Sequence, residues 1–161
     1  MPDPITRARL ASTVDGHTIA RQGRVAEENL HLTLLFLGNV DTARLPILKR
    51  GASGVRATPF SLQIDCSGWW KAPRIFWLAP GQAPASLLLL HKALAGLAVE
   101  CGIAIEIWPY LPHVTLARKV DKPAAIKFAP IRWHVSDFCL VESVTRSGYV
   151  EYQIIQRWTL T

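Results

Sequence analysis

The chain has 161 residues, half of them apolar, which is enough for one domain with a sizeable buried core and excludes a disordered tail protein. Lys and Arg outnumber Asp and Glu by 18 to 12, and the formal charge of +6 favours a polyanionic partner such as RNA. The basic residues are scattered, however, so a generally positive, solvated surface explains them equally well.

Three cysteines, Cys66, Cys101 and Cys139, are odd in number and widely spaced. This spacing indicates neither a zinc knuckle nor a disulfide framework, and it favours small buried side chains in a reducing compartment. Residues 1–10 lack the apolar region of a signal peptide, and the most apolar stretch, residues 87–90, is too short to span a bilayer. We therefore expect a cytoplasmic protein with no membrane partner.

The first half of the chain predicts two helices and four strands. Asp3 and Pro4 are typical of a helix start, and a weaker helix contains Pro46. Apolar alternation and turn residues predict the strands. The expected helices cover residues 3–12 and 43–51, and the expected strands cover residues 24–27, 30–37, 60–66 and 74–79.

The predicted loop from Gly68 to Pro73 brings together Trp69, Trp70 and Lys71. Tryptophans are most often core packing, and these two are consistent with that role. Exposed at the rim of a cleft, they would instead offer a surface on which bases stack. Trp70 is therefore a candidate substrate contact, with core packing as the alternative.

The second half of the chain opens with the best helix, residues 84–101, which has leucines at helical spacing and ends before Gly102. His91 on this helix is expected to be structural or solvent-facing. An extended stretch is expected at residues 103–108 and a strand within 109–119. A strand-rich end is expected at residues 131–144 and 149–160, these last two forming a hairpin around Ser147 and Gly148. Helices interspersed among strands with few βαβ-length repeats predict an α+β domain of mainly antiparallel sheet.

The most informative pattern is an internal echo. The segment His31-Leu-Thr33-Leu returns as His113-Val-Thr115-Leu about half a chain length later. Such a repeat rarely arises by chance, and it predicts two pseudo-symmetric lobes with a central cleft. His17 and His134 have no such echo and keep an ordinary structural interpretation.

Alternation along a strand gives each echo segment a chemical face. Leu32 and Leu34 are expected to enter the core, while His31 and Thr33 point together to the other face. In the second segment, Val114 and Leu116 are likewise expected in the core, with His113 and Thr115 on the other face. Opening a cyclic phosphodiester needs a base for water, an acid for the departing oxygen, and donors for the nonbridging oxygens. Two histidines and two threonines supply these groups near neutral pH without a metal or other cofactor.

At these residues the sequence resembles the 2H phosphoesterases, and among them the bacterial and archaeal RNA 2′,3′-cyclic phosphodiesterases, also called 2′-5′ RNA ligase-like proteins. The resemblance runs from about Val25 to Leu160 and is most specific in the paired motifs. It is carried by Asn29-Leu-His-Leu-Thr-Leu with Phe36-Leu-Gly38, by Trp77-Leu78, by Leu90-His91-Lys-Ala-Leu94 and by Pro112-His-Val-Thr-Leu-Ala-Arg118.

The resemblance implies a role for each matching position. His31 resembles the proton donor to the 3′ oxygen and His113 the proton acceptor that activates water, leaving a 2′-phosphate. Thr33, Thr115 and Arg118 match phosphate-binding positions, and a guanidinium suits such an anion. Tyr110 matches an aromatic position that stacks near the ribose or base, with core packing as the alternative. The expected partners are RNA ends or small nucleotides with a cyclic phosphate, with no obligate protein partner.

The resemblance also implies one departure. Family members usually open with an Arg-x-Phe-x-Ala-type strand before the first helix, and this chain begins at that helix. We expect residues 1–161 to form a single 2H phosphoesterase domain without this strand. Either the true start lies further upstream or the strand has been lost, and its loss would leave a sheet edge uncovered.

Four activities remain open at this point. Hydrolysis of RNA 2′,3′-cyclic phosphate ends is the leading expectation. A phosphodiesterase acting on small cyclic nucleotides or 2′-5′ oligoadenylates would use the same residues. Joining RNA ends through a 2′-5′ bond is the reverse reaction, which dilute water disfavours. A binding module without turnover would need the threonines and Arg118 but not two titratable rings.

Overall fold

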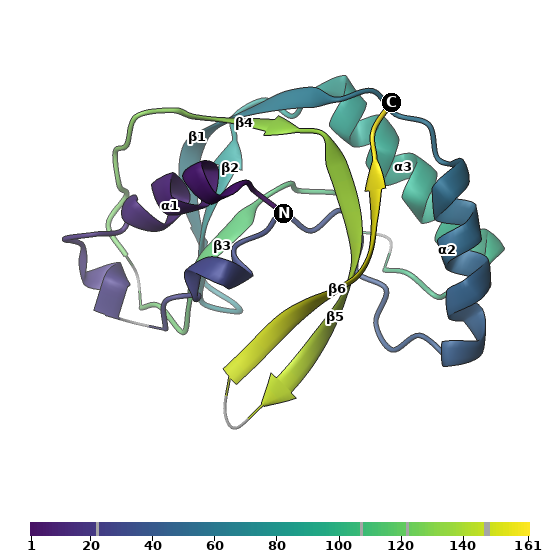
Figure 1. Ribbon diagram of the computed structural model, residues 1–161. Helices are drawn as coiled ribbons and strands as arrows, with labels where there is room; N and C mark the ends of the chain where they lie inside the picture. The colour runs from purple at the N-terminus through teal and green to yellow at the C-terminus, as the bar shows by residue number, and fades with distance from the viewer. Residues whose placement is uncertain (22, 107, 122, 147–148) are drawn as a thin grey trace. The chain divides into compact units, whose positions relative to one another are not determined.

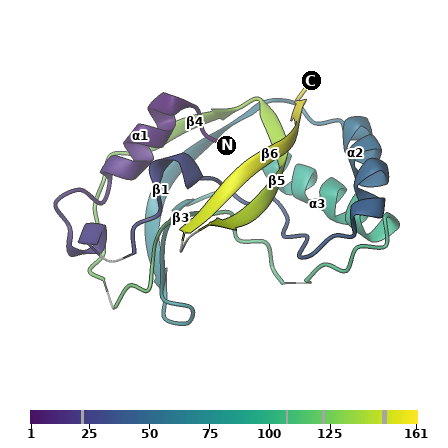
Figure 2. The same ribbon diagram turned by 60° about the horizontal axis from the view of Figure 1, so that its bottom comes forward.

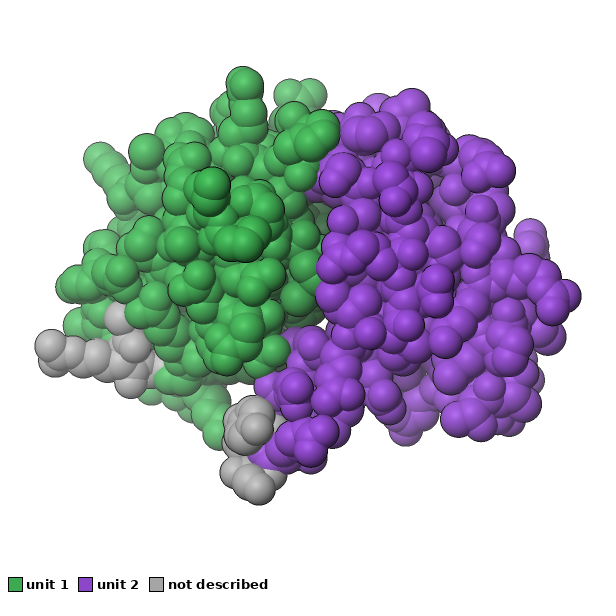
Figure 3. All heavy atoms as spheres, in the orientation of Figure 1, with its two compact units in different colours: residues 1–32, 61–83, 112–134 green, residues 33–60, 84–111, 135–161 purple. Residues whose placement is uncertain are grey.

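The computed structural model describes residues 1–21, 23–106, 108–121, 123–146 and 149–161. These residues form two compact units, each assembled from three separate stretches of chain (Figure 3). The first unit contains residues 1–32, 61–83 and 112–134, and the second contains residues 33–60, 84–111 and 135–161. Antiparallel sheet and helices in these units give the α+β class that the sequence predicted. Pseudo-symmetry and a central cleft stay predictions.

The first unit is built on a four-stranded sheet with the order β3-β2-β1-β4 (Figure 1). Strands β1, β2 and β3 pair antiparallel. Phe60, Leu62 and Ile64 of β1 are buried while the residues between them are exposed, which confirms the predicted alternation. The strands are β1 (Phe60–Trp70), β2 (Ile75–Pro80), β3 (Val114–Arg118) and β4 (Ile131–Val135).

Helix α1 (Pro4–Ser12) belongs to the first unit and begins where its cap predicts. The Asp3 carboxylate accepts hydrogen bonds from the backbone N–H groups of Ile5 and Thr6, both at 3.0 Å. Leu10 and Ala11 on this helix are buried, and Figures 1 and 2 show α1 lying across the sheet of the same unit. The helix therefore covers one face of the sheet that carries β3.

The second unit contains the β5–β6 hairpin and the helices α2 and α3. Strands β5 (Asp137–Arg146) and β6 (Tyr149–Thr159) pair antiparallel as predicted, while the predicted turn at Ser147 and Gly148 lies outside the described residues. The helices are α2 (Leu45–Gly54), α3 (Ala85–Glu100) and short 3₁₀ turns such as Thr42–Arg44. A Cβ on Gly51 of α2 would lie 2.2 Å from the Leu97 side chain of α3, so the two helices pack closely there.

The core of the second unit centres on Leu48, Ala98 and Ile103. Gly102 ends α3 with a φ of +69°, the left-handed geometry that the predicted stop required. No helix in the described part of the chain is long and apolar enough to cross a membrane.

Several predictions about boundaries and burial were wrong. Gly68, Trp69 and Trp70 belong to β1 rather than to a loop, because they pair with β2. The strand-rich segment 131–144 contains β4 and the first part of β5, separated at Ser136, and residues 103–106 and 108 are in no strand. Cys66 is exposed rather than buried, because the register of β1 with β2 shifts between Ile64 and Cys66 and interrupts the alternation.

The predicted strands at residues 24–27 and 30–37 are reduced to single bridges. Arg24 bridges to Ala117 and Leu32 bridges to Val114, both antiparallel. Between the two bridges, Glu27–Asn29 form a 3₁₀ turn that carries the chain away from β3. The apolar pattern is present in the sequence, but among the described residues these segments form bridges to β3 at two positions only.

Candidate active site

Strand β3 carries the second echo segment and sets its two faces. Val114 and Leu116 are buried at 0% and 2% exposure, as alternation predicted. Thr115, between them, projects from the opposite face and is half-buried. The residue of β2 that pairs with Thr115 is Trp77, whose side chain therefore projects to the same face of the sheet.

The first echo segment lies beside β3 through the bridge between Leu32 and Val114. Continued by one residue in the same antiparallel register, this bridge would place His31 opposite Thr115, and opposed residues of an antiparallel pair project to the same face. The bridge brings the His31 end of the first echo segment beside β3 in the first unit, whereas Thr33 belongs to the second unit.

The backbone around His31 determines its tautomer. His31 Nδ1 lies 2.7 Å from the carbonyl oxygen of Asn29, and a carbonyl only accepts, so Nδ1 carries the proton. In the neutral ring, the lone pair that can take up a proton is then on Nε2. His31 can thus exchange a proton with a bound group through Nε2 while Nδ1 holds the ring in place.

Burial and nearby positive charge act on the same ring. Burial lowers the pKa of His31, and the positive charges of the N-terminus, Arg118 and His113 lower it further, while the Asn29 hydrogen bond opposes the shift. Arg118 and His113 therefore lie close enough to His31 to affect its charge. A site that disfavours a further positive charge is suited to a bound anion.

His113 immediately precedes β3 and contacts an aromatic pair. Its ring centroid lies 4.6 Å from that of Trp70 in an edge-on arrangement, and Trp70 lies 5.4 Å from Trp77. Gly68 makes room for Trp77, because a Cβ there would lie 2.2 Å from the indole. The Trp70 ring thus orients the imidazole of His113. This role is a third possibility besides substrate contact and core packing.

Arg118 at the end of β3 has an exposed side chain and a tightly held backbone. Its N–H donates to the carbonyl of Gly23 at 2.9 Å. Gly23 has a φ of +54°, and a Cβ there would lie 2.2 Å from the Arg118 carbonyl oxygen. Glycine at position 23 is therefore needed for this close approach.

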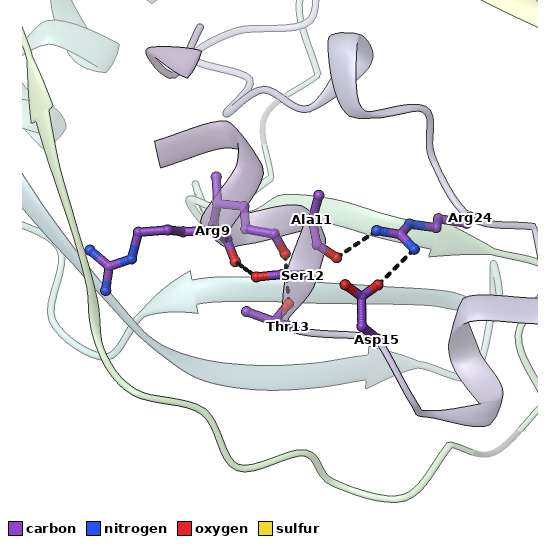
Figure 4. Close-up of polar contacts among 7 residues, drawn as sticks. Arg9, Ala11, Ser12, Thr13, Asp15 and Arg24 are labelled. Carbon is purple, nitrogen blue, oxygen red and sulfur yellow. Dashed lines mark hydrogen bonds and ion pairs between the residues drawn. The ribbon is translucent and has the colours of Figure 1, made fainter. Parts of the chain in front are cut away.

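The segment beside β3 is also tied to helix α1 through Arg24 (Figure 4). The Arg24 guanidinium donates to the carbonyl oxygen of Ala11 at 2.8 Å and to the Asp15 carboxylate at 2.9 Å. Val25 N–H donates to the Leu116 carbonyl at 2.8 Å. These bonds join the end of α1 to the strand that carries Thr115 and Arg118.

Thr33 and Tyr110 belong to the second unit. The Tyr110 hydroxyl donates to the Thr33 carbonyl at 3.2 Å, and its ring stacks on His91 with centroids 4.0 Å apart and an interplanar angle of 5°. Thr33 itself is exposed. One face of Tyr110 is thus occupied by His91.

Sequence reasoning selected five residues that the first unit brings together, namely His31, His113, Thr115, Arg118 and Trp70. It missed Trp77, Gly23 and the carbonyl of Asn29. The signal for Trp77 was present, since alternation along residues 74–79 places it opposite the buried Phe76 and Leu78. Gly23 had no comparable signal, because its role depends on the pairing with β3.

Among the described residues, no group of three or more His, Cys, Asp or Glu side chains is arranged to hold a metal ion. The described polar groups of the site are instead imidazoles, a hydroxyl and a guanidinium, all of which bind anionic oxygen.

Comparisons with known proteins identify the family of this chain. Residues 2–146 match the 2′-5′ RNA ligase superfamily. The RNA 2′,3′-cyclic phosphodiesterase of Escherichia coli (strain K12) is 34% identical over 139 residues, covering 85% of this chain and 79% of that protein. The enzyme of the same name from Thermus thermophilus is 32% identical, covering 93% of this chain and 83% of that protein.

Solved structures extend the similarity to the whole chain. The crystal structure of E. coli LigT complexed with 3′-AMP superposes with a TM-score of 0.93 at 30% identity, covering 100% of this chain and 94% of that one. E. coli LigT complexed with ATP superposes with a TM-score of 0.88, also at 30% identity, covering 100% of this chain and 94% of that one. The chain therefore belongs to the 2′-5′ RNA ligase superfamily and is homologous to RNA 2′,3′-cyclic phosphodiesterases over most of its length.

Proposed function

We propose that this chain hydrolyses RNA 2′,3′-cyclic phosphate ends to 2′-phosphates, with His31 and His113 as acid and base and with no metal ion in the chemical step. The observation that carries the proposal is the Leu32–Val114 bridge, which puts the two histidine segments side by side in antiparallel register. The homology to RNA 2′,3′-cyclic phosphodiesterases supports the same reaction.

In the proposed step, water attacks phosphorus and gives a proton to His113. The bond between phosphorus and the 3′ oxygen breaks, and that oxygen takes a proton from Nε2 of His31. The product has a 2′-phosphate and a free 3′-hydroxyl, and solvent resets the two rings. Thr33, Thr115 and Arg118 donate to the nonbridging oxygens as their charge increases.

The lowered pKa of His31 affects this assignment. In the free protein, burial and the charges of the N-terminus, Arg118 and His113 favour the neutral ring. A bound phosphate brings negative charge next to the imidazole and raises its pKa. Substrate binding therefore favours the protonated ring that acts as the acid, so binding and activation are coupled.

The test is an assay with an RNA oligonucleotide that ends in a 2′,3′-cyclic phosphate, with EDTA present. We expect the wild type to produce a 2′-phosphate, identified by mass and by phosphatase sensitivity. His31→Ala and His113→Ala should each lower kcat by at least about a hundredfold, because each removes an acid or base. Turnover that needs an added metal ion, or that survives both substitutions, contradicts the mechanism.

An activated substrate separates the acid from the base. Bis(p-nitrophenyl) phosphate has a leaving group that departs without a proton, so the variant that lacks only the acid should recover more of its activity on this substrate. Recovery by His31→Ala and not by His113→Ala supports the assignment. The reverse pattern exchanges the two roles.

Small nucleotides are a second candidate substrate class. Structures of E. coli LigT complexed with 3′-AMP, ATP and NADP+ superpose on this chain, and 3′-AMP is a single nucleotide. We infer that this chain also accepts mononucleoside 2′,3′-cyclic phosphates. Comparison of kcat/KM for a mononucleotide and an oligonucleotide decides which class is preferred.

A further inference from the structure

Two side chains of the second unit hold consecutive carbonyls of the segment that begins with Thr33. His91 Nδ1 lies 2.8 Å from the carbonyl oxygen of Leu34, so this nitrogen donates. The Tyr110 hydroxyl donates to the carbonyl oxygen of Thr33 at 3.2 Å. The two rings stack face to face with centroids 4.0 Å apart, so the two donor side chains pack against each other.

The held segment needs this support. Residues 33–37 form no helix or strand, so regular backbone pairing does not hold Thr33 in place. The Thr33 side chain is exposed, and the described contact of this residue within its unit is made by its carbonyl. Fixing the two carbonyls limits the directions in which the Cα–Cβ bond of Thr33, and with it the hydroxyl, can project.

We propose that His91 and Tyr110 form a clamp that positions the Thr33 hydroxyl for the substrate phosphate. The inference rests on the proposed function, and it gives roles to a histidine on α3 and to a tyrosine whose ring was expected to meet the ribose or base. His91 and Tyr110 are positioning residues, since they act through the backbone of Thr33 and Leu34. Burial also raises the pKa of Tyr110, which keeps its hydroxyl a donor through the working pH range.

Paired substitutions separate the two components of the clamp. His91→Asn keeps a donor near the Nδ1 position and loses the stacked ring, whereas His91→Phe keeps a ring and loses the donor. Tyr110→Phe removes one oxygen and leaves the stack intact. Lys92→Gln, at an exposed neighbouring position on α3, is the matched control.

The decisive readout is coupling to Thr33. Thr33→Val removes the hydroxyl but leaves the carbonyl that Tyr110 holds. We expect Tyr110→Phe and His91→Phe each to lower kcat/KM about fivefold, as for one lost hydrogen bond, while His91→Asn is closer to wild type. In the Thr33→Val background, the same substitutions should have almost no further effect.

Inorganic phosphate is the probe that does not depend on turnover. Its Kd, measured by calorimetry, should rise about fivefold for Tyr110→Phe and should not rise further when Thr33→Val is already present. If the wild type lacks turnover while this pattern holds, the proposed function fails and the clamp stands. If Kd and kcat/KM do not change, or if the effects are the same with and without the Thr33 hydroxyl, the clamp is overturned. Should His91→Phe fail to fold, Tyr110→Phe alone decides.

Discussion

Opposing influences act on the imidazole of His31. Burial, together with the positive charges of the N-terminus, Arg118 and His113, disfavours its protonated form, and the hydrogen bond from Nδ1 to Asn29 favours it. The net result is a lowered pKa, although the ring remains firmly oriented. The same surroundings that keep the ring neutral in the free protein attract an anion.

The lowered pKa couples His31 to folding. In the unfolded chain the ring has its ordinary pKa of about 6.5, and in the folded chain the value is lower. Between these values the unfolded state binds more protons, so the free energy of unfolding rises with pH. The folded state therefore loses stability as the pH falls below about 6.5, and it keeps this contribution above that value.

Substitution of His31 tests this coupling. His31→Asn keeps a donor for the Asn29 carbonyl but cannot be protonated. We expect the free energy of unfolding, measured in urea, to fall less for this variant than for the wild type between about pH 7.5 and about pH 5. An equal loss for both proteins would show that His31 protonation is not linked to folding.

At the scale of elements, the short segment beside β3 supports the site. Gly23 accepts the backbone N–H of Arg118, and Arg24 connects the segment to α1 (Figure 4). Neither residue takes part in the proposed reaction. Together they fix the backbone at the end of β3, from which the Arg118 side chain extends.

Gly23→Ala should therefore disturb Arg118. The new Cβ would lie 2.2 Å from the Arg118 carbonyl oxygen, so the backbone must shift. Gly16→Ala is the matched control, because Gly16 also has a positive φ but a Cβ there meets nothing within 4 Å. The positive φ costs each variant about 1 kcal/mol.

We expect Gly23→Ala to lose clearly more stability than Gly16→Ala and to bind inorganic phosphate more weakly. Denaturant unfolding and calorimetry measure the two effects. Equal stability losses with unchanged phosphate affinity would contradict the supporting role of Gly23.

Local chemistry explains which elements could be predicted from the sequence. The Asp3 cap, the leucine spacing of α3, the alternation in β1 and the hairpin partners are properties of short segments, and all were predicted correctly. The strand at residues 30–37 was wrong because its existence depends on how much of β3 it can pair with. Trp69 and Trp70 were placed in a loop because only their pairing with β2 makes them part of a strand.

The same distinction applies to the site. The echo identified His31, His113 and both threonines as candidates, because repetition is visible along the chain. The place of Trp77 opposite Thr115 and the fit of Gly23 depend on pairing between distant segments. The Asn29 carbonyl lies only two residues from His31, but a backbone group leaves no signal in the residue types. His91 was expected to be structural or solvent-facing, and its bond to the Leu34 carbonyl became visible only once α3 was placed beside that segment.

For the whole molecule, the positive charge of +6 predicts how RNA is bound. If the chain contacts RNA phosphates beyond the terminal one, binding releases counterions, and log KM rises with log salt by about 0.7 for each contacted phosphate. We expect a steeper salt dependence of KM for an oligonucleotide than for a mononucleoside 2′,3′-cyclic phosphate. Equal slopes would mean that only the terminal nucleotide is held.

The interleaving of the two units has a consequence during protein synthesis. The first unit needs residues 1–32, 61–83 and 112–134, and the second needs residues as far apart as 33 and 161. A ribosome must therefore translate residue 134 before the first unit has all its parts. His31 leaves the exit tunnel long before Val114, so the nascent histidine segment is without its partner strand for about half of translation.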